Sequence, residues 1–236
     1  MAEHREKYHT VPMNVMGMVT KNLTKSDKEY HTEGARLAVR AEIDKLIEAG
    51  VWDIVPLSKS DAIKLHPDAS FSRIFGILGI KDMESNTAKY KYRVVIQGSN
   101  VRDHSGEHVY FADTSSAPTN MVAIRSVIAY GQLSGGSCSQ ADAQQAFIQP
   151  LLEEDVHMYI HVPPEMMSEE MRKQASKVQN PVFRLRRPLY GWSRSGNIWE
   201  THLADTLKEI KHGSDQWKPV EYWPQTFWKI GSKGKP

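Results

Sequence analysis

The sequence predicts an α+β fold, because helical and extended patterns follow one another along the chain in no regular order. Residues 33–49 carry apolar side chains at helical spacing, and Gly50 follows where a C-cap glycine belongs. Residues 89–97 alternate strictly between apolar or aromatic and basic or polar side chains, as a strand with one exposed face does. The helical stripe consists of Val39, Ile43, Leu46 and Ile47.

Shorter patterns predict the elements on either side of that strand. Residues 51–56 form a short extended piece that ends at Pro56. Residues 72–80 have the composition of a buried strand, and the polar residues 81–88 form a turn. Together with residues 89–97 they predict a β-hairpin with one basic face.

The second half of the chain predicts two helices and two strands. Thr119 or Asn120 caps a helix that closes near Gly131, and Asn197 with Glu200 starts another as a capping box. Residues 156–162 read as a half-buried strand, and residues 182–189 alternate apolar and basic side chains. The helical stripes are Met121, Ile124, Val127 and Ile128 in the first helix, and Trp199, Leu203, Leu207 and Ile210 in the second.

Length and charge exclude several classes of protein. The chain has 236 residues, with 30 Lys and Arg against 28 Asp and Glu, a net charge of +2. This balance excludes binding to nucleic acid by bulk charge alone. The single cysteine, Cys138, excludes a disulfide framework and a cysteine-built zinc site, and fits a reducing compartment. No apolar run reaches the roughly 20 residues of a membrane span, so we expect an intracellular protein without membrane contact.

Candidate metal ligands are few. His104 and His108, and also His157 and His161, share a four-residue spacing, but no cysteine or carboxylate completes a four-ligand set, which favours ordinary surface histidines. Asp142 is a lone acid between two alanines. A carboxylate at a strand end can hold Mg²⁺ together with substrate phosphates, whereas an Asp in a turn or helix cap has no such role. The segment alone favours the turn or cap.

The basic face of residues 89–97 has two interpretations. Lys89, Lys91 and Arg93 are spaced about 6.6 Å apart along one face of a strand, which matches phosphates of a triphosphate or a nucleic-acid backbone. Lysines on an exposed strand also prevent edge-to-edge pairing. Both interpretations stay open from this segment alone.

Five segments, in this order, resemble the reverse transcriptase domain of Ty1/copia-type LTR retrotransposons. The resemblance runs from about residue 33 to the C-terminus and rests on residues 42–56, 89–98, 140–148, 153–164 and 189–199. Its most informative piece is Gln140-Ala-Asp142-Ala-Gln-Gln-Ala-Phe147-Ile148, similar to the family's Gln-Met-Asp-Val-Lys-Thr-Ala-Phe-Leu. Another is Leu189-Tyr190-Gly191, which resembles the family's Leu-Tyr-Gly before a tryptophan.

The resemblance implies the fingers and palm of a right-hand polymerase in residues 33–236, with residues 1–32 as a linker or upstream polyprotein segment. The implied reaction is RNA- or DNA-templated addition of deoxynucleotides, in which two Mg²⁺ ions promote attack of a primer 3′-hydroxyl on the α-phosphate. The implied partners are the template–primer, dNTPs and other parts of a Pol polyprotein. The compartment stays open between a cytoplasmic particle and the nucleus.

The resemblance also assigns roles to residues at matching positions. Asp142 is the catalytic carboxylate and ligates both metal ions, aided by the backbone carbonyl of Ala143. The incoming nucleotide is bound by Lys91 and Arg93 at its phosphates, by backbone N–H groups of Gln145 and Ala146, and by Phe147, which excludes a 2′-hydroxyl. Tyr190, Gly191 and Arg187 contact base, template or primer. For Arg184, Arg186 and Arg187, solvent exposure is an equal alternative.

One departure from the family pattern bears on activity. The family's second catalytic motif, Tyr-x-Asp-Asp, is expected after residue 231, and the sequence contains no Asp-Asp dipeptide. We therefore expect a polymerase domain truncated before its second palm motif and inactive by itself, because one carboxylate leaves the metal ions under-ligated. A non-catalytic nucleic-acid-binding remnant is the alternative, since it needs only the basic strand.

Overall fold

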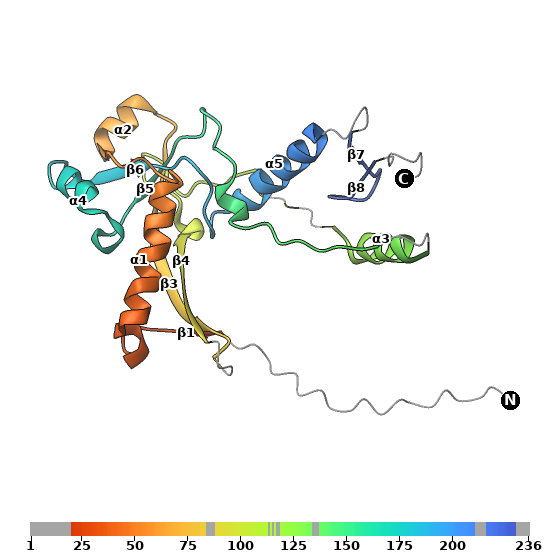
Figure 1. Ribbon diagram of the computed structural model, residues 1–236. Helices are drawn as coiled ribbons and strands as arrows, with labels where there is room; N and C mark the ends of the chain where they lie inside the picture. The colour runs from red at the N-terminus through yellow and green to blue at the C-terminus, as the bar shows by residue number, and fades with distance from the viewer. Residues whose placement is uncertain are drawn as a thin grey trace. The chain divides into compact units, whose positions relative to one another are not determined.

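The computed structural model describes residues 20–83, 88–112, 114, 116, 119–133, 137–210 and 216–229. It divides into two compact units, one of residues 1–42 with 76–93 and one of residues 43–75 with 94–236. Helices and strands are mixed, as the α+β prediction requires (Figure 1). Most of the predicted linker, residues 1–19, and residues 84–87 of the predicted turn lie outside the described residues. No described helix combines the length and the apolarity that crossing a bilayer requires.

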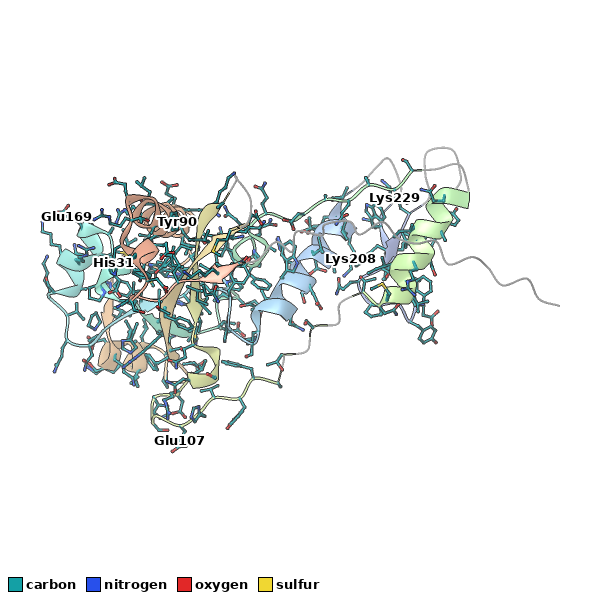
Figure 2. All side chains as sticks on the ribbon, turned by 90° about the horizontal axis from the view of Figure 1, so that it is seen from below. His31, Tyr90, Glu107, Glu169, Lys208 and Lys229 are labelled. Atoms are coloured by element: carbon teal, nitrogen blue, oxygen red, sulfur yellow. The ribbon has the colours of Figure 1, made fainter. Side chains whose placement is uncertain are left out.

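The first unit contains the C-terminal end of a long strand, β3 (Ser70–Lys81). Strand β1 (Lys21–Asn22) pairs antiparallel with the end of β3, and the 3₁₀ turn η1 (Lys28–His31) leads into helix α1 (Glu33–Glu48). Thr32 Oγ1 donates a hydrogen bond of 2.9 Å to the hydroxyl of Tyr90, which Figure 2 labels. The sequence predicted no element before residue 33, because two paired residues leave no periodicity to detect.

The predicted hairpin is confirmed. Strand β4 (Lys89–Ile96) pairs with β3, and its side chains alternate between exposed and buried. The basic residues predicted for one face are exposed, whereas Tyr92, Val94 and Ile96 are buried. Gly76 of β3 is required, because an added Cβ would lie 1.7 Å from the hydroxyl oxygen of Tyr92. The exposed residues are Lys89, Lys91 and Arg93.

The sheet of the second unit contains one parallel pair. The start of β3 pairs parallel with β5 (Met158–His161), β5 pairs antiparallel with β6 (Pro181–Arg184), and β6 pairs with β2 (Leu57–Ser58). A strand lies within residues 156–162 as predicted, but the prediction that it is half-buried is wrong: Tyr159, expected to be exposed, has only 1% of its surface exposed. The reason is that Tyr159 belongs to a buried cluster with Ala62, Phe71 and Val182, so the face of β5 that was expected to be exposed is covered.

Three helices lie before, between or after the strands of this sheet along the chain. Helix α2 (Lys59–Leu65) is capped by Ser58, whose Oγ accepts from Asp61 N, and α4 (Glu169–Ala175) is capped by Ser168 in the same way. Helix α5 (Ser195–Glu209) begins two residues before the predicted Asn197 cap. Ser195 instead donates its hydroxyl to Leu189 O at 2.6 Å, which ties the helix start to the preceding segment. The seven-residue helices α2 and α4 were not predicted.

Helix α3 (Met121–Leu133) is where it was predicted, but its apolar stripe is not covered. Asn120 is the cap, with its side-chain oxygen accepting from Ala123 N at 2.7 Å. Met121, Ile124 and Val127 are exposed, as is Ile128, and Ala123 is buried. The described remainder of the unit comprises the 3₁₀ turns η2 (Gly98–Asn100), η3 (Ala146–Ile148) and η4 (Pro164–Met166), and the pair β7 (Lys218–Pro219) and β8 (Phe227–Trp228).

Candidate active site

Two aromatic side chains from different predicted motifs meet in the second unit. Phe147 lies in η3, and its ring packs edge-on against the ring of Tyr190, with 4.8 Å between the centroids and an interplanar angle of 63°. Phe147 is half-buried, and 42% of the surface of Tyr190 is exposed. An edge-to-face aromatic pair of this kind holds both rings in a defined orientation while leaving one ring open to solvent.

The position of Tyr190 is fixed by the end of β4. Ile96 N donates to Tyr190 O at 2.8 Å, and Val95 and Tyr190 form an isolated parallel bridge. Gly191 has a φ of +85°, and a Cβ at this residue would lie 2.4 Å from Ile96 O. Only glycine therefore fits at this position, for both conformational and steric reasons.

Arg187 holds the turn that carries Phe147. Its guanidinium donates from Nε to Ala49 O at 3.0 Å and from Nη1 to Ile148 O at 3.2 Å, with a further hydrogen bond to Gln149 O. Helix α5 also lies against η3. Three carbonyl acceptors bind this guanidinium, which ties Arg187 to the turn that carries Phe147.

Asp142 lies on an exposed, irregular stretch immediately before η3. The structure places no strand in residues 137–143, so Asp142 is not at a strand end. Gln145 has a left-handed φ of +56° at the start of η3, and Gln149 Nε2 donates to Gln144 O at 2.8 Å. Ala143 is exposed and Ala146 is half-buried.

The surroundings of Asp142 do not complete a metal centre. In the part of the chain that the structure describes, one group of three His, Cys, Asp or Glu side chains is close enough to share an ion, and it does not include Asp142. A Mg²⁺ ion takes six oxygen ligands, of which several are usually waters and the rest are one or two carboxylates and substrate phosphates, so two ions need more carboxylates than Asp142 alone. The described residues therefore do not fit a two-metal site by themselves.

The predicted phosphate-binding residues Lys91 and Arg93 lie on the exposed face of β4, in the first unit. Asp142, Gln145 and Phe147 belong to the second unit. The structure thus brings together Phe147, Tyr190, Gly191 and Arg187, and describes the basic strand separately. The sequence indicates both the aromatic group and the basic strand as candidate binding residues. Only the family resemblance assigns them to the same nucleotide-binding function.

The other two basic residues of 182–189 have protein partners. Arg184 Nη2 donates to Glu154 O at 2.8 Å, and Arg186 forms a bidentate pair with Asp53 through hydrogen bonds of 2.8 Å from Nε and Nη2. Arg186 is exposed, as one of the two interpretations expects, and Arg184 is half-buried. They connect the end of β6 to two neighbouring segments of the chain.

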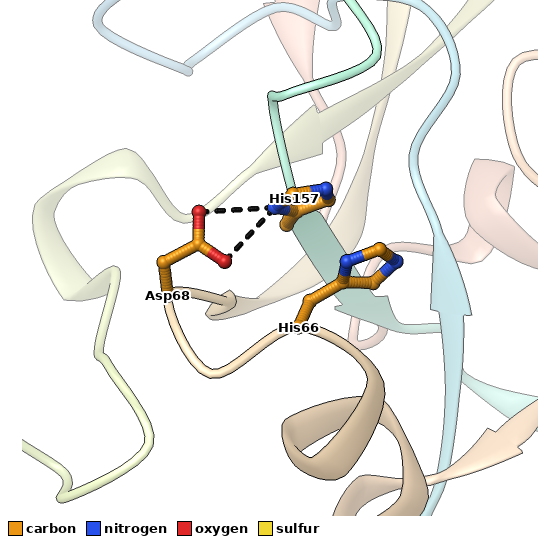
Figure 3. Close-up of side chains that lie close together, drawn as sticks. All are labelled: His66, Asp68 and His157. Carbon is orange, nitrogen blue, oxygen red and sulfur yellow. Dashed lines mark hydrogen bonds and ion pairs between the residues drawn. The ribbon is translucent and has the colours of Figure 1, made fainter.

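A cluster of His66, Asp68 and His157 was not predicted as a group (Figure 3). His157 was noted only for its spacing to His161, and His161 is not part of the cluster. The short spacing from His66 to Asp68 was the available signal, but the third residue is distant in the sequence. Only the parallel pairing of β3 with β5 brings His157 to the other two.

Comparison with known proteins defines the class to which this fold and site belong. Residues 74–220 match the family described as reverse transcriptase (RNA-dependent DNA polymerase), and the chain belongs to this family. The chain is also 28% identical over 179 residues to the Retrovirus-related Pol polyprotein from transposon RE1 of Arabidopsis thaliana. That alignment covers 74% of the chain and 11% of the relative. No solved structure matches the chain.

These comparisons confirm the resemblance to the reverse transcriptase domain of copia-type retrotransposons. The family match includes every candidate site residue, from Lys91 to Gly191. It begins within β3 and ends after β7, so α1, on which part of the predicted resemblance rests, lies outside it.

Proposed function

We propose that this chain contributes the fingers and the first part of the palm to an RNA-directed DNA polymerase. Its substrates are a template–primer and dNTPs, and its context is a Pol polyprotein, of which the matched relative is an example. The observation that carries the proposal is the packing of Phe147 on Tyr190, inside the family-matched segment. This pair gives the residue assigned to sugar selection a fixed orientation.

The family resemblance assigns nucleotide binding to two groups of residues, one in each unit. Phe147 lies under the deoxyribose and clashes with a 2′-hydroxyl, which excludes ribonucleotides. Backbone N–H groups of Gln145 and Ala146 bind the triphosphate. Lys91 and Arg93 bind its outer phosphates, and the planar guanidinium of Arg93 suits several phosphate oxygens at once.

The template side of the proposed site is formed by Tyr190 and Gly191. The 42% exposure of Tyr190 leaves part of the ring surface open for a base or sugar. Gly191 lets the backbone after Tyr190 pack closely against Ile96, which holds Tyr190 in place at the proposed site. Arg187 acts by holding the Phe147 turn, because its guanidinium is bonded to backbone carbonyls.

The proposed catalytic carboxylate is Asp142, and the proposed metals are two Mg²⁺ ions. Reverse transcriptases in general use divalent metal ions, and Asp142 with the carbonyl of Ala143 offers oxygen ligands of the kind Mg²⁺ prefers. The described residues do not fit such a centre alone, and the 236 residues contain no Asp-Asp dipeptide. We therefore propose that residues 1–236 by themselves do not incorporate nucleotides.

Primer extension tests this proposal. Residues 1–236 are compared with a polypeptide that continues in the same reading frame through a Tyr-x-Asp-Asp motif. The longer polypeptide is expected to extend a primer with dNTPs and Mg²⁺, and residues 1–236 are expected not to. A longer polypeptide that is folded, contains the motif and binds template–primer but never extends it would contradict the polymerase assignment.

A second candidate function is nucleic-acid binding without catalysis. The exposed row of Lys89, Lys91 and Arg93 favours it, because such a row needs no metal centre to contact a phosphate backbone. Binding of residues 1–236 to a template–primer in EDTA, weakening with added salt and with K91A and R93A, supports this candidate. A reading frame that stops after codon 236 would also favour it over polymerisation.

A further inference from the structure

The His66, Asp68 and His157 side chains gather where two neighbouring strands begin. Ser70 opens β3 and pairs in parallel register with Met158, which opens β5. Ser70 N donates to His157 O at 2.9 Å, so the residue before β5 is joined directly to the start of β3. Because parallel strands begin at the same edge of a sheet, the turn at residues 66–69 and His157 share that edge.

The local backbone holds the cluster in place. Pro67 separates His66 from Asp68 and restricts φ in a turn that is closed by Ala69 N donating to His66 O at 3.0 Å. The His66 ring stacks on the His157 ring, with 3.6 Å between centroids. His157 Nδ1 lies 2.9 and 3.0 Å from the two carboxylate oxygens of Asp68 (Figure 3).

We propose that His66, Asp68 and His157 bind one Zn²⁺ ion. Two imidazole nitrogens and one carboxylate oxygen are a common set of three protein ligands for zinc, with water in the fourth position. Imidazole is a poor ligand for Mg²⁺, which prefers oxygen, so this site is distinct in chemistry from the proposed catalytic metals. The ion would link the α2–β3 turn to the start of β5 and stabilise the folded unit.

The cavity beside Asp68 and His157 is acidic. This cavity of about 180 Å³ is lined by Asp68 and His157, two of the three ligands, and also by the carboxylates of Glu153 and Asp155. Arg194 lines the same cavity, and Arg184 and Arg186 act on His66 from nearby, so all three oppose the carboxylates in charge. The net contribution of the ionisable residues in this lining is therefore negative when the carboxylates are ionised, and the volume leaves room for water ligands.

The protonation states also suit ligation. Burial, together with the nearby His157 and Arg184, lowers the pKa of His66 below its ordinary value, which favours the neutral imidazole that binds metal. The hydrogen bond from His157 lowers the pKa of Asp68, which favours the carboxylate. If His157 ligates through Nδ1, its proton resides on Nε2 in the bound state, and the metal replaces the hydrogen bond to Asp68.

Binding of the ion requires the two imidazole rings to unstack. Their planes differ by only 15°, and the lone pair of each ring nitrogen lies in its ring plane, so two stacked rings cannot both point at one ion. The ligand atoms lie within 4.8 Å of one another. Zinc bonds of about 2.0–2.1 Å in tetrahedral geometry need ligand atoms about 3.3 Å apart. The Asp68 side chain is 66% exposed and free to turn, whereas the His157 side chain is 15% exposed and held by its surroundings. Rotation of Asp68 and His66, which unstacks the two rings, is thus the expected response to the ion.

Equilibrium dialysis of metal-stripped protein against Zn²⁺ tests the site without reference to polymerase activity. The variants are His66→Gln and Asp68→Asn, at side chains that are not fully buried, and the controls are His104→Gln and His108→Gln, at the exposed histidine pair. We expect one tightly bound Zn²⁺ per chain, weakened at least about tenfold by either site variant and unchanged by the controls. Thermal melting in EDTA verifies that each variant is folded.

Two further readouts distinguish a built site from loose surface binding. Co²⁺ in place of zinc is expected to give the visible absorption of a tetrahedral ion in the parent and not in the Asp68→Asn variant. Zn²⁺ is expected to raise the melting temperature of the parent protein and to leave that of the two site variants unchanged. Equal Zn²⁺ affinity in the parent and both site variants would overturn the proposal. A parent that retains no Zn²⁺ would overturn it as well, whatever the chain does with nucleotides.

Discussion

The edge of the Phe147 ring meets Tyr190 at a centroid distance of 4.8 Å, although the two residues come from separate sequence motifs. The contact depends on backbone features around it: the hydrogen bond from Ile96 N to Tyr190 O, the left-handed Gly191, and Arg187 on the carbonyl of Ile148. The site's geometry is therefore set by the ends of β4 and β6 rather than by the motif residues alone.

Phe147→Ala is expected to relax sugar selection in a polypeptide that extends primers. Removal of the ring eliminates the proposed clash with a 2′-hydroxyl, so the ratio of ribonucleotide to deoxynucleotide incorporation should rise by about tenfold or more. Steady-state kinetics with matched rNTP and dNTP measure this ratio. Tyr190→Phe keeps the ring contact and serves as the control; an unchanged ratio in Phe147→Ala would remove Phe147 from the proposed nucleotide site.

Gly191→Ala is expected to destabilise the second unit by more than about 3 kcal/mol, since left-handed strain and a steric clash add together. Its Cβ would lie 2.4 Å from Ile96 O. Gly50→Ala is the matched control, because Gly50 also has a positive φ of 63° but has nothing within 4 Å of an added Cβ. Gly50→Ala is expected to lower the free energy of unfolding by about 1–2 kcal/mol. Urea unfolding of both variants gives the difference, and equal costs would contradict the close packing at Gly191.

Arg187→Ala is expected to lower the free energy of unfolding by about 2–3 kcal/mol, because it leaves backbone carbonyls of Ala49 and Ile148 without their charged donor. Arg186→Ala removes a partly exposed pair with Asp53 and should cost less than about 1 kcal/mol. Chemical denaturation compares the two. If Arg187→Ala weakens template binding while stability is unchanged, Arg187 contacts nucleic acid instead of positioning Phe147.

His161 is expected to make the fold less stable in mild acid. Burial, with Lys59 and Arg73 nearby, lowers the pKa of His161 below its ordinary value of 6.5. As the pH falls through 6.5, the unfolded chain takes up this proton before the folded chain does, so the free energy of unfolding falls toward lower pH. Denaturant melts at pH 7 and pH 5 should differ less in His161→Gln than in the parent. The exposed His104→Gln is the control, and an identical pH dependence in His161→Gln and the parent would contradict this role.

The local patterns predicted helices and strands well where one face of the element is buried and the other is exposed to solvent. The hairpin of β3 and β4 follows directly from its alternation, and α1 follows from its stripe and Gly50. For β5 the strand was predicted but its exposed face was not found, because the alternation at Tyr159 reflects residue type and does not reveal the cluster of Ala62, Phe71 and Val182 that covers this side chain. The stripe of α3 was found, but a stripe cannot reveal whether anything covers it.

The residues of the candidate site could be predicted from the sequence, but the contacts between them could not. The sequence with the family resemblance named Phe147, Tyr190, Gly191 and Arg187, and the structure brings these together. It did not reveal that Arg187 bonds to backbone carbonyls, since donors and acceptors distant in the chain leave no local pattern. For the same reason the sequence did not predict that His157 lies beside His66 and Asp68, because only the pairing of β3 with β5 brings the three together.

The most direct test of the central claim is Asp142→Asn in a primer-extending polypeptide that contains this chain. Asp142 is exposed, so the substitution should change the free energy of unfolding by less than about 0.5 kcal/mol. Asp205→Asn, at an exposed residue of α5, is the matched control. The account predicts that dNTP incorporation is lost in Asp142→Asn and retained in Asp205→Asn, with both proteins folded. Undiminished incorporation by Asp142→Asn would contradict the assignment of the catalytic carboxylate.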